Sequence, residues 1–236
     1  EVMVVGKIEY EVLLPGFIAS FTASYTSHFL GLEKFSVNIQ QCANVNDMKY
    51  IMLMILLGII FGIVGRLFST ALSVSKTFLK DKIKNSYKRI GYVSIILVIG
   101  LMIFKGRYSG LGTNLIELSF HQNVTVYDWF LKLIFTVITL AIGFQGGEVT
   151  PLFSIGSTLG FILAYLFHLH LPIELCAALG YAGVFASATN TLFAPIMIGL
   201  EVFGGSNMFA FIIVCIFAYL INGNKSIYTA QSNEIK

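Results

Sequence analysis

The sequence has few charged residues. Only 11% of its 236 residues are Asp, Glu, Lys or Arg, while 56% are hydrophobic, and the mean hydropathy is +0.82. Soluble domains carry about 25% charged residues, so this composition excludes a soluble domain. We expect an all-α, polytopic membrane protein, because a helix satisfies its own backbone hydrogen bonds in lipid. At about 20 residues per membrane helix, the chain could form roughly eight to ten segments, some of them short.

Cysteine is also scarce. Cys42, Cys176 and Cys215 are an odd number of cysteines at unrelated spacings, which argues against a disulfide framework and against a metal site. We expect them to be small apolar residues, and we expect neither a metal nor a cofactor. No basic and then apolar leader follows the initial Glu, so we expect no signal peptide and a start that cuts through a longer chain. Residues 1–236 are treated as one transmembrane domain.

Basic side chains gather in one short region between two apolar segments. They are Lys76, Lys80, Lys82, Lys84, Lys88 and Arg89, with Asp81 as the acid among them. The positive-inside rule predicts that this region is a cytoplasmic loop. A nucleic-acid partner is not expected, because the cluster lies between membrane segments and not on a soluble face.

Apolar segments alternate with polar or glycine-rich breaks along the whole chain. The expected helices are residues 12–30, 50–75, 90–104, 114–120, 129–143, 152–166, 173–187, 192–203 and 208–221. The last five are short, and short, glycine-interrupted segments are typical of transporters and channels with broken helices. Segment 50–75 is long enough to tilt and to project from the membrane. Gly58 with Gly62, and Gly156 with Gly160, are spaced for close helix contacts.

The break at residues 146–151 has the sequence Gly-Gly-Glu-Val-Thr-Pro. Irregular backbone at membrane depth persists only where it is buried in protein or lines a water-filled cavity. Gly146 and Gly147 allow unusual backbone conformations, Thr150 is a favourable N-cap residue, and Pro151 suits the first position of a helix. A helix that begins here directs free N–H groups and its positive dipole end into the break, an arrangement that binds anions.

Glu148 lies inside this break. A charged carboxylate costs about 2.5–3.5 kcal/mol at the centre of a membrane helix, so it must be paired, protonated or hydrated. We interpret Glu148 as part of an anion pathway, and the alternative is a structural carboxylate that caps the helix. A carboxylate and an anion repel each other, so an approaching anion favours the protonated acid, which can donate a hydrogen bond to it. This coupling would link anion movement to protons.

The chain resembles the second half of a CLC-type anion transporter, and specifically the fluoride/proton antiporter branch. Residues 146–151 stand where chloride-handling members carry Gly-x-Phe-x-Pro, and the Glu-Val-Thr variant is typical of the fluoride branch. Three further stretches resemble the family in the same order: residues 152–160, residues 194–201 with Glu201, and the Gly-Asn-Lys-Ser-Ile-Tyr sequence of residues 223–228. The resemblance extends from about residue 12 to about residue 230.

The resemblance implies a CLC-type bundle of tilted and broken helices, the second half of an inverted repeat, which works as a homodimer in the cell membrane. Segments 12–30, 192–203 and 208–221 would form the dimer contact. The Gly-Arg-Glu-Gly motif of the first half, whose glutamate gates the pathway, is absent from this sequence. The chain would therefore supply half of the pathway, and its partner would be the missing N-terminal half.

The resemblance also implies the residues that line the pathway. Gly146, Gly147 and Glu148 would belong to it, as would the Val149 amide, the Thr150 hydroxyl and the phenol of Tyr228. Fluoride is small and tightly hydrated, so a selective site must replace its water with strong donors in a low-dielectric setting. As alternatives, Thr150 would only cap the helix, and Tyr228 would be an interfacial anchor.

The sequence therefore predicts a fluoride/proton antiporter that exports cytoplasmic fluoride and imports protons. A CLC-type chloride channel or chloride/proton antiporter is the main alternative, and Glu148 and Thr150 argue against it. A fragment that is inactive without its N-terminal half is a third possibility. An intramembrane enzyme is disfavoured, because the sequence has no Gly-x-Ser-x-Gly or His-Glu-x-x-His pattern.

Overall fold

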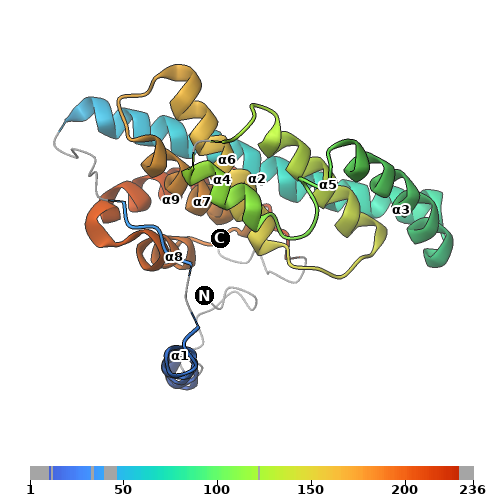
Figure 1. The fold of residues 1–236 in the computed structure, drawn as a ribbon, viewed down its shortest axis with the longest axis horizontal. Helices are drawn as coiled ribbons and strands as arrows, with labels where there is room; N and C mark the ends of the chain where they lie inside the picture. Colours follow the sequence, from blue (N-terminus) through green and yellow to red (C-terminus); the bar gives the residue numbers. More distant parts are fainter. Residues whose placement is uncertain (1–10, 12, 33–34, 40–46, 122, 229–236) are drawn as a thin grey trace.

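The computed structural model describes residue 11 and residues 13–32, 35–39, 47–121 and 123–228. These residues form α-helices and a short 3₁₀ turn, without a β-strand among them (Figure 1). The helices are α1 (Leu13–Phe29), α2 (Met48–Lys82), α3 (Ser86–Ile103), α4 (Thr113–Phe120), α5 (Asp128–Ile142), α6 (Val149–Phe167), α7 (Ile173–Thr189), α8 (Phe193–Phe203) and α9 (Met208–Asn222); the 3₁₀ turn η2 (Gly205–Asn207) precedes α9. Each segment predicted to be helical overlaps one of these helices, so the all-α prediction is confirmed.

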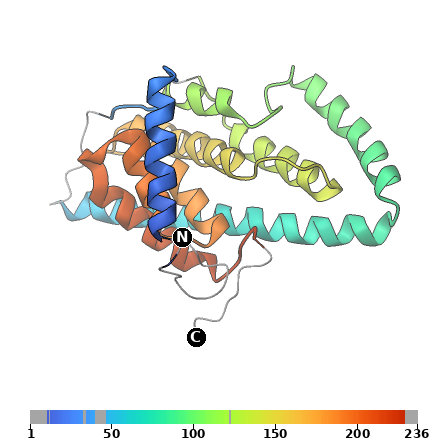
Figure 2. The ribbon, with the colours of Figure 1, turned by 90° about the horizontal axis from the view of Figure 1, so that it is seen from below.

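Helix α2 runs along one side of the molecule (Figure 2). Asp47 caps its start by accepting a hydrogen bond from the Lys49 amide at 3.0 Å. Its 35 residues extend over about 52 Å, well beyond the about 30 Å of a bilayer core, as expected for a helix that tilts and projects. Within the described part of the chain, four stretches are long and apolar enough to cross a membrane: Met48–Lys82, Ser86–Ile103, Val149–Phe167 and Gly205–Asn222.

The core lies around helices α6 and α7, which form an antiparallel pair. A Cβ atom added at Gly156 would collide with the carbonyl oxygen of Gly180, and one added at Gly160 would collide with that of Cys176. The two backbones therefore approach as closely as the small-residue spacing predicted. Gly58 and Gly62 of α2 pack in the same way against α9, so this contact is confirmed too.

The basic region is a tight corner between two helices, whereas we predicted a loop. Lys76, Lys80 and Lys82 lie in α2, while Lys88 and Arg89 lie in α3, which leaves only residues 83–85 between the helices. Asn85 caps α3 by accepting from the amides of Tyr87 and Lys88, at 3.0 and 3.3 Å. The helices extend into the corner because lysine and arginine are good helix formers and this cap is available.

Helix α1 stands apart from the other helices (Figure 1). None of its residues with a described burial is buried, and Phe17, Phe21 and Phe29 are 61%, 74% and 80% exposed. Its apolar surface is thus available for lipid or for another protein chain. Cys176 and Cys215 are buried free thiols, and Cys42 lies outside the described residues.

Candidate functional site

The predicted break lies between α5 and α6. Helix α5 ends at Ile142, and Gly143 turns the chain in a left-handed conformation (φ 110°) that favours glycine. Residues 143–147 are exposed, and α6 begins at Val149. The chain therefore interrupts its helices at the position of the Gly-Gly-Glu-Val-Thr-Pro sequence.

The prediction that Thr150 caps α6 is wrong. Glu148 is the N-cap residue, with helical backbone angles and no capping bond from its side chain, so Thr150 and Pro151 are the second and third residues of the helix. The earlier start has a simple cause: the first-turn N–H groups have no partner within the helix, so a proline in that turn removes no hydrogen bond. As a result, the amides of Val149 and Thr150 are first-turn N–H groups directed toward the break. The Thr150 hydroxyl makes no hydrogen bond to the described residues.

Glu148 is paired with a cation from a distant helix. Its Oε1 lies 3.6 Å from Nζ of Lys76 on α2, and the two side chains are 23% and 34% exposed. We expected Glu148 to be paired, protonated or hydrated, because an isolated charge is costly at membrane depth, and the structure shows it paired. We had interpreted Lys76 only as part of the orienting basic cluster, and no local sequence signal distinguishes it from its neighbours.

Tyr228 lies on the segment that follows α9, and hydrogen bonds hold this segment against the end of α7. The Ile227 amide donates to the Ala188 carbonyl at 3.0 Å, the Ser226 hydroxyl donates to the Thr189 carbonyl at 3.1 Å, and the Tyr228 amide donates to the Ser226 hydroxyl at 3.1 Å. Burial, together with the negative charge of Glu148, raises the pKa of the Tyr228 phenol. The structure thus brings Tyr228 within electrostatic reach of Glu148.

Arg89 fixes the position of the break on the α5 side. Its side chain is buried, and its Nε donates to the carbonyl of Ile142, the last residue of α5, at 3.1 Å. Cations stabilise the negative end of a helix, and here the cation also satisfies a carbonyl that has no partner within α5. Arg89 therefore contributes to the geometry of the site as well as to the charge of the basic corner.

A second support comes from the turn between α3 and α4, where Leu111 packs against Gly147. Lys132 of α5 is buried, and its ammonium donates to the carbonyls of Tyr108 and Gly110 at 3.1 and 2.7 Å. These bonds hold the backbone of the residues that directly precede Leu111. A lysine can lie here without a carboxylate partner because peptide carbonyls accept its hydrogen bonds.

The same turn is anchored by a buried carboxylate, Asp128 at the start of α5. Arg107 reaches it with two nitrogens, at 2.9 and 2.6 Å, and the Tyr108 hydroxyl donates to it at 2.7 Å. Thr125 adds bonds from its amide and its hydroxyl, at 2.8 and 2.7 Å. Bidentate pairing with so many donors fixes both the charge and the orientation of the carboxylate.

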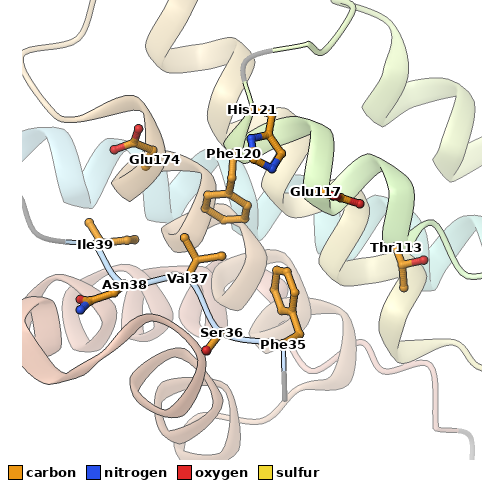
Figure 3. A pocket seen from close by; sticks show the side chains of 10 residues that line it. All are labelled: Phe35, Ser36, Val37, Asn38, Ile39, Thr113, Glu117, Phe120, His121 and Glu174. Carbon is orange, nitrogen blue, oxygen red and sulfur yellow. The ribbon is translucent and has the colours of Figure 1, made fainter. Parts of the chain in front are cut away.

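The structure has one cavity that borders the break and a larger one elsewhere. A cavity of about 280 Å³ borders it and is lined by Gly146, Gly147 and Pro151 together with Lys132 and Tyr108. A larger cavity of about 770 Å³ lies between residues 35–39, α4 and the start of α7 (Figure 3).

Glu117, His121 and Glu174 line the larger cavity (Figure 3). Glu174 stands at the start of α7, which lies beside the end of α6, so Glu174 is separated from Glu148 by the length of α6. That helix has 19 residues and is about 28 Å long. The Glu174 side of the larger cavity therefore lies at the opposite end of the α6–α7 pair, while Thr113 follows Gly112, which packs against Ser154 near the start of α6.

Comparison with known proteins agrees with this architecture. The family model described as "Voltage gated chloride channel" matches residues 1–223. The chain belongs to this family, the CLC family. CLC proteins are multi-pass membrane proteins, in keeping with the four membrane-length helices among the described residues.

Two relatives are informative. A curated protein named "Chloride/fluoride channel protein", from Pseudomonas syringae pv. tomato (strain ATCC BAA-871 / DC3000), is 36% identical over 238 residues, which is 98% of this chain and 52% of the relative. A solved structure titled "Crystal structure of a CLC-type fluoride/proton antiporter" is 51% identical, with a TM-score of 0.93, over 98% of this chain and 58% of that chain. This CLC chain thus spans about half the length of the relatives it matches.

Proposed function

We propose that this chain supplies the second half of a fluoride/proton antiporter, which exports cytoplasmic fluoride and imports protons. One observation carries the proposal: Glu148 stands at the start of α6, two residues before Thr150, whose hydroxyl has no partner among the described residues, and within electrostatic reach of Tyr228. An acid, a hydroxyl, a phenol and first-turn amides are thereby collected around one break. The 51% identity to a solved fluoride/proton antiporter supports the same substrate.

Fluoride would be bound by hydrogen-bond donors at the break. The amides of Val149 and Thr150, the Thr150 hydroxyl and the Tyr228 phenol each offer one donor, and the dipole of α6 adds a favourable potential. Donors in a low-dielectric site are electrostatically stronger than in water, which a strongly hydrated ion requires. Gly146 and Gly147 place no side chain of their own in the approach.

Protons would enter through Glu148. As a carboxylate, Glu148 repels an arriving fluoride ion, and as a neutral acid it donates a hydrogen bond to it. Fluoride and a proton therefore favour each other at this position, and this mutual stabilisation is the physical basis of coupled transport. The gating glutamate of the first half would carry the proton across the remainder of the pathway.

The N-terminal half is the first partner implied by the proposal. The relatives are about twice as long as this chain, and the exposed helix α1 offers apolar surface to further protein. A homodimer is the second partner implied by the family resemblance. Phe193 and Met197 of α8 and Phe209 of α9 are 64%, 61% and 60% exposed, which suits a contact with a second copy within the membrane.

A chloride-selective pathway is the competing function, and the name of the 36% identical relative includes both ions. Chloride is larger and less strongly hydrated than fluoride, so a site for it needs fewer strong donors and gains less from the hydrogen bond of a neutral acid. Glu148 and the free Thr150 hydroxyl favour fluoride for this reason.

The test is ion flux in liposomes that contain the full-length protein, meaning this chain joined to its N-terminal half. A fluoride electrode measures efflux, and a pH electrode measures the accompanying proton uptake. We expect fluoride to leave much faster than chloride, with protons moving in the opposite direction. Equal rates for chloride and fluoride would reject the fluoride assignment, and fluoride efflux without proton uptake would reject antiport.

A further inference from the structure

We propose that Lys76 is the counter-ion of Glu148 and that it sets the dependence of fluoride affinity on pH in this pathway. The inference rests on the proposed function and adds to it a residue outside the break. It starts from the ion pair of 3.6 Å between Lys76 Nζ and Glu148 Oε1, which joins α2 to the start of α6. The partial exposure of both side chains allows protons and ions to reach the pair.

Lys76 differs from the other basic residues of its helix in position. Lys80, one turn further along α2, is exposed, whereas Lys76 is only partly exposed and approaches Glu148. Glu148 forms an ion pair with Lys76 of α2, and its charge also acts on Tyr228 of the C-terminal segment. Arg89 of α3 is engaged beside the break, at the Ile142 carbonyl.

The charge of the site follows from this pairing. With Glu148 ionised, the Lys76–Glu148 pair is neutral and has little attraction for an anion. When Glu148 takes up a proton, its negative charge is lost and Lys76 remains as an uncompensated cation beside the first-turn amides of α6. Fluoride then restores neutrality. Joint uptake of one proton and one fluoride ion therefore leaves the net charge beside Lys76 unchanged.

We therefore expect the effect of removing the Lys76 charge on fluoride binding to depend on pH. Lys76 attracts the negative charge of the Glu148 carboxylate, and once that charge is neutralised it attracts the negative charge of a bound fluoride ion by a similar amount. At acidic pH, where Glu148 is already protonated, only the second effect is felt, and Lys76→Met weakens fluoride binding. At alkaline pH fluoride must bind together with a proton, and the two effects cancel.

The experiment measures the apparent KM for fluoride against pH in liposomes that contain the full-length protein. In the unmodified protein, Lys80→Met and Lys76→Arg, we expect one common profile. In Lys76→Met we expect a KM raised about fivefold at the acidic end, as for the loss of a partly exposed ion pair. The difference should shrink to nothing as pH rises. KM does not depend on the amount of active protein, and Lys76→Gln serves as a second neutral variant if Lys76→Met folds poorly.

The outcomes separate this inference from the proposed function. An unmodified protein that moves no fluoride would overturn the antiporter. If the unmodified protein is active, coincident profiles for Lys76→Met and Lys80→Met would overturn the role of Lys76 alone. A KM raised equally at every pH, or a lower maximal rate with an unchanged KM, would show a structural contact and would also overturn it.

Discussion

The Nζ atom of Lys76 and the Oε1 atom of Glu148 lie 3.6 Å apart, although 71 residues separate them in the chain. The contact ties the long helix α2 to the interruption before α6. On the other side of the same interruption, Arg89 donates to the end of α5 at Ile142. The two cations thus come from the two sides of one basic corner and approach the break from both of its ends.

Replacing Glu148 by glutamine tests the acid. Glutamine keeps the shape of the side chain but neither ionises nor takes up a proton. We expect Glu148→Gln to abolish the proton uptake that accompanies fluoride efflux, measured with a pH electrode outside liposomes. Glu174→Gln is the matched control, because Glu174 stands at the other end of the α6–α7 pair. Proton uptake in Glu148→Gln equal to that of the control would remove Glu148 from the proton path.

Thr150→Ala should reduce the preference for fluoride over chloride by about tenfold, which corresponds to one hydrogen bond to a charged group. Because the Thr150 hydroxyl makes no hydrogen bond to the described residues, we expect little change in the thermal unfolding of the purified protein. Thr150→Ser, which keeps the hydroxyl, should retain the preference. An unchanged ion preference in Thr150→Ala would exclude the hydroxyl from the site.

Tyr228→Phe should raise the apparent KM for fluoride by about tenfold, since it removes one donor from the anion. Because the pKa of the phenol is raised, its neutral form, which donates the hydrogen bond, persists above the usual pKa of about 10. We therefore expect no loss of fluoride binding from ionisation of Tyr228 between about pH 8 and 10. If phenylalanine is tolerated without a change in KM, Tyr228 is an anchor and not a donor.

The contact between α6 and α7 predicts a stability effect. Gly160→Ala should lower the free energy of unfolding by about 1–3 kcal/mol, the usual cost of overpacking, because the new methyl group meets the Cys176 carbonyl. Gly91→Ala on α3 is the control, since nothing lies within 4 Å of a Cβ atom placed there. Thermal unfolding in detergent compares the two, and equal midpoints would contradict the packing described for α6 and α7.

The Arg107–Asp128 pair predicts a second stability effect. Arg107→Ala leaves the fully buried carboxylate of Asp128 without its bidentate partner, so we expect a loss of about 3 kcal/mol. Arg107→Lys restores the charge but not the two parallel bonds, and it should recover only part of the stability. Full stability in Arg107→Ala would mean that the bonds from Tyr108 and Thr125 suffice.

The sequence alone determined the helices and the place of the break. Apolar length and glycine or polar interruptions are local signals, so every predicted helix was found, and the Gly-Gly-Glu-Val-Thr-Pro sequence marked the interruption before α6. The small-residue spacings at Gly58 and Gly156 likewise indicated close contacts, because a missing side chain is visible in the sequence. The family resemblance rested on the same local patterns.

Only the tertiary structure decided which distant groups meet at the break. The start of α6 at Val149 rather than Pro151 depends on how the chain leaves α5, and no cap residue announces it. In the sequence, Lys76 and Arg89 are two of six similar cations. In the structure, the corner of α2 and α3 packs so that these two reach Glu148 and the end of α5. Tyr228 comes near Glu148 because backbone bonds attach its segment to the end of α7. Such contacts depend on the packing of several helices together, and no single stretch of sequence encodes them.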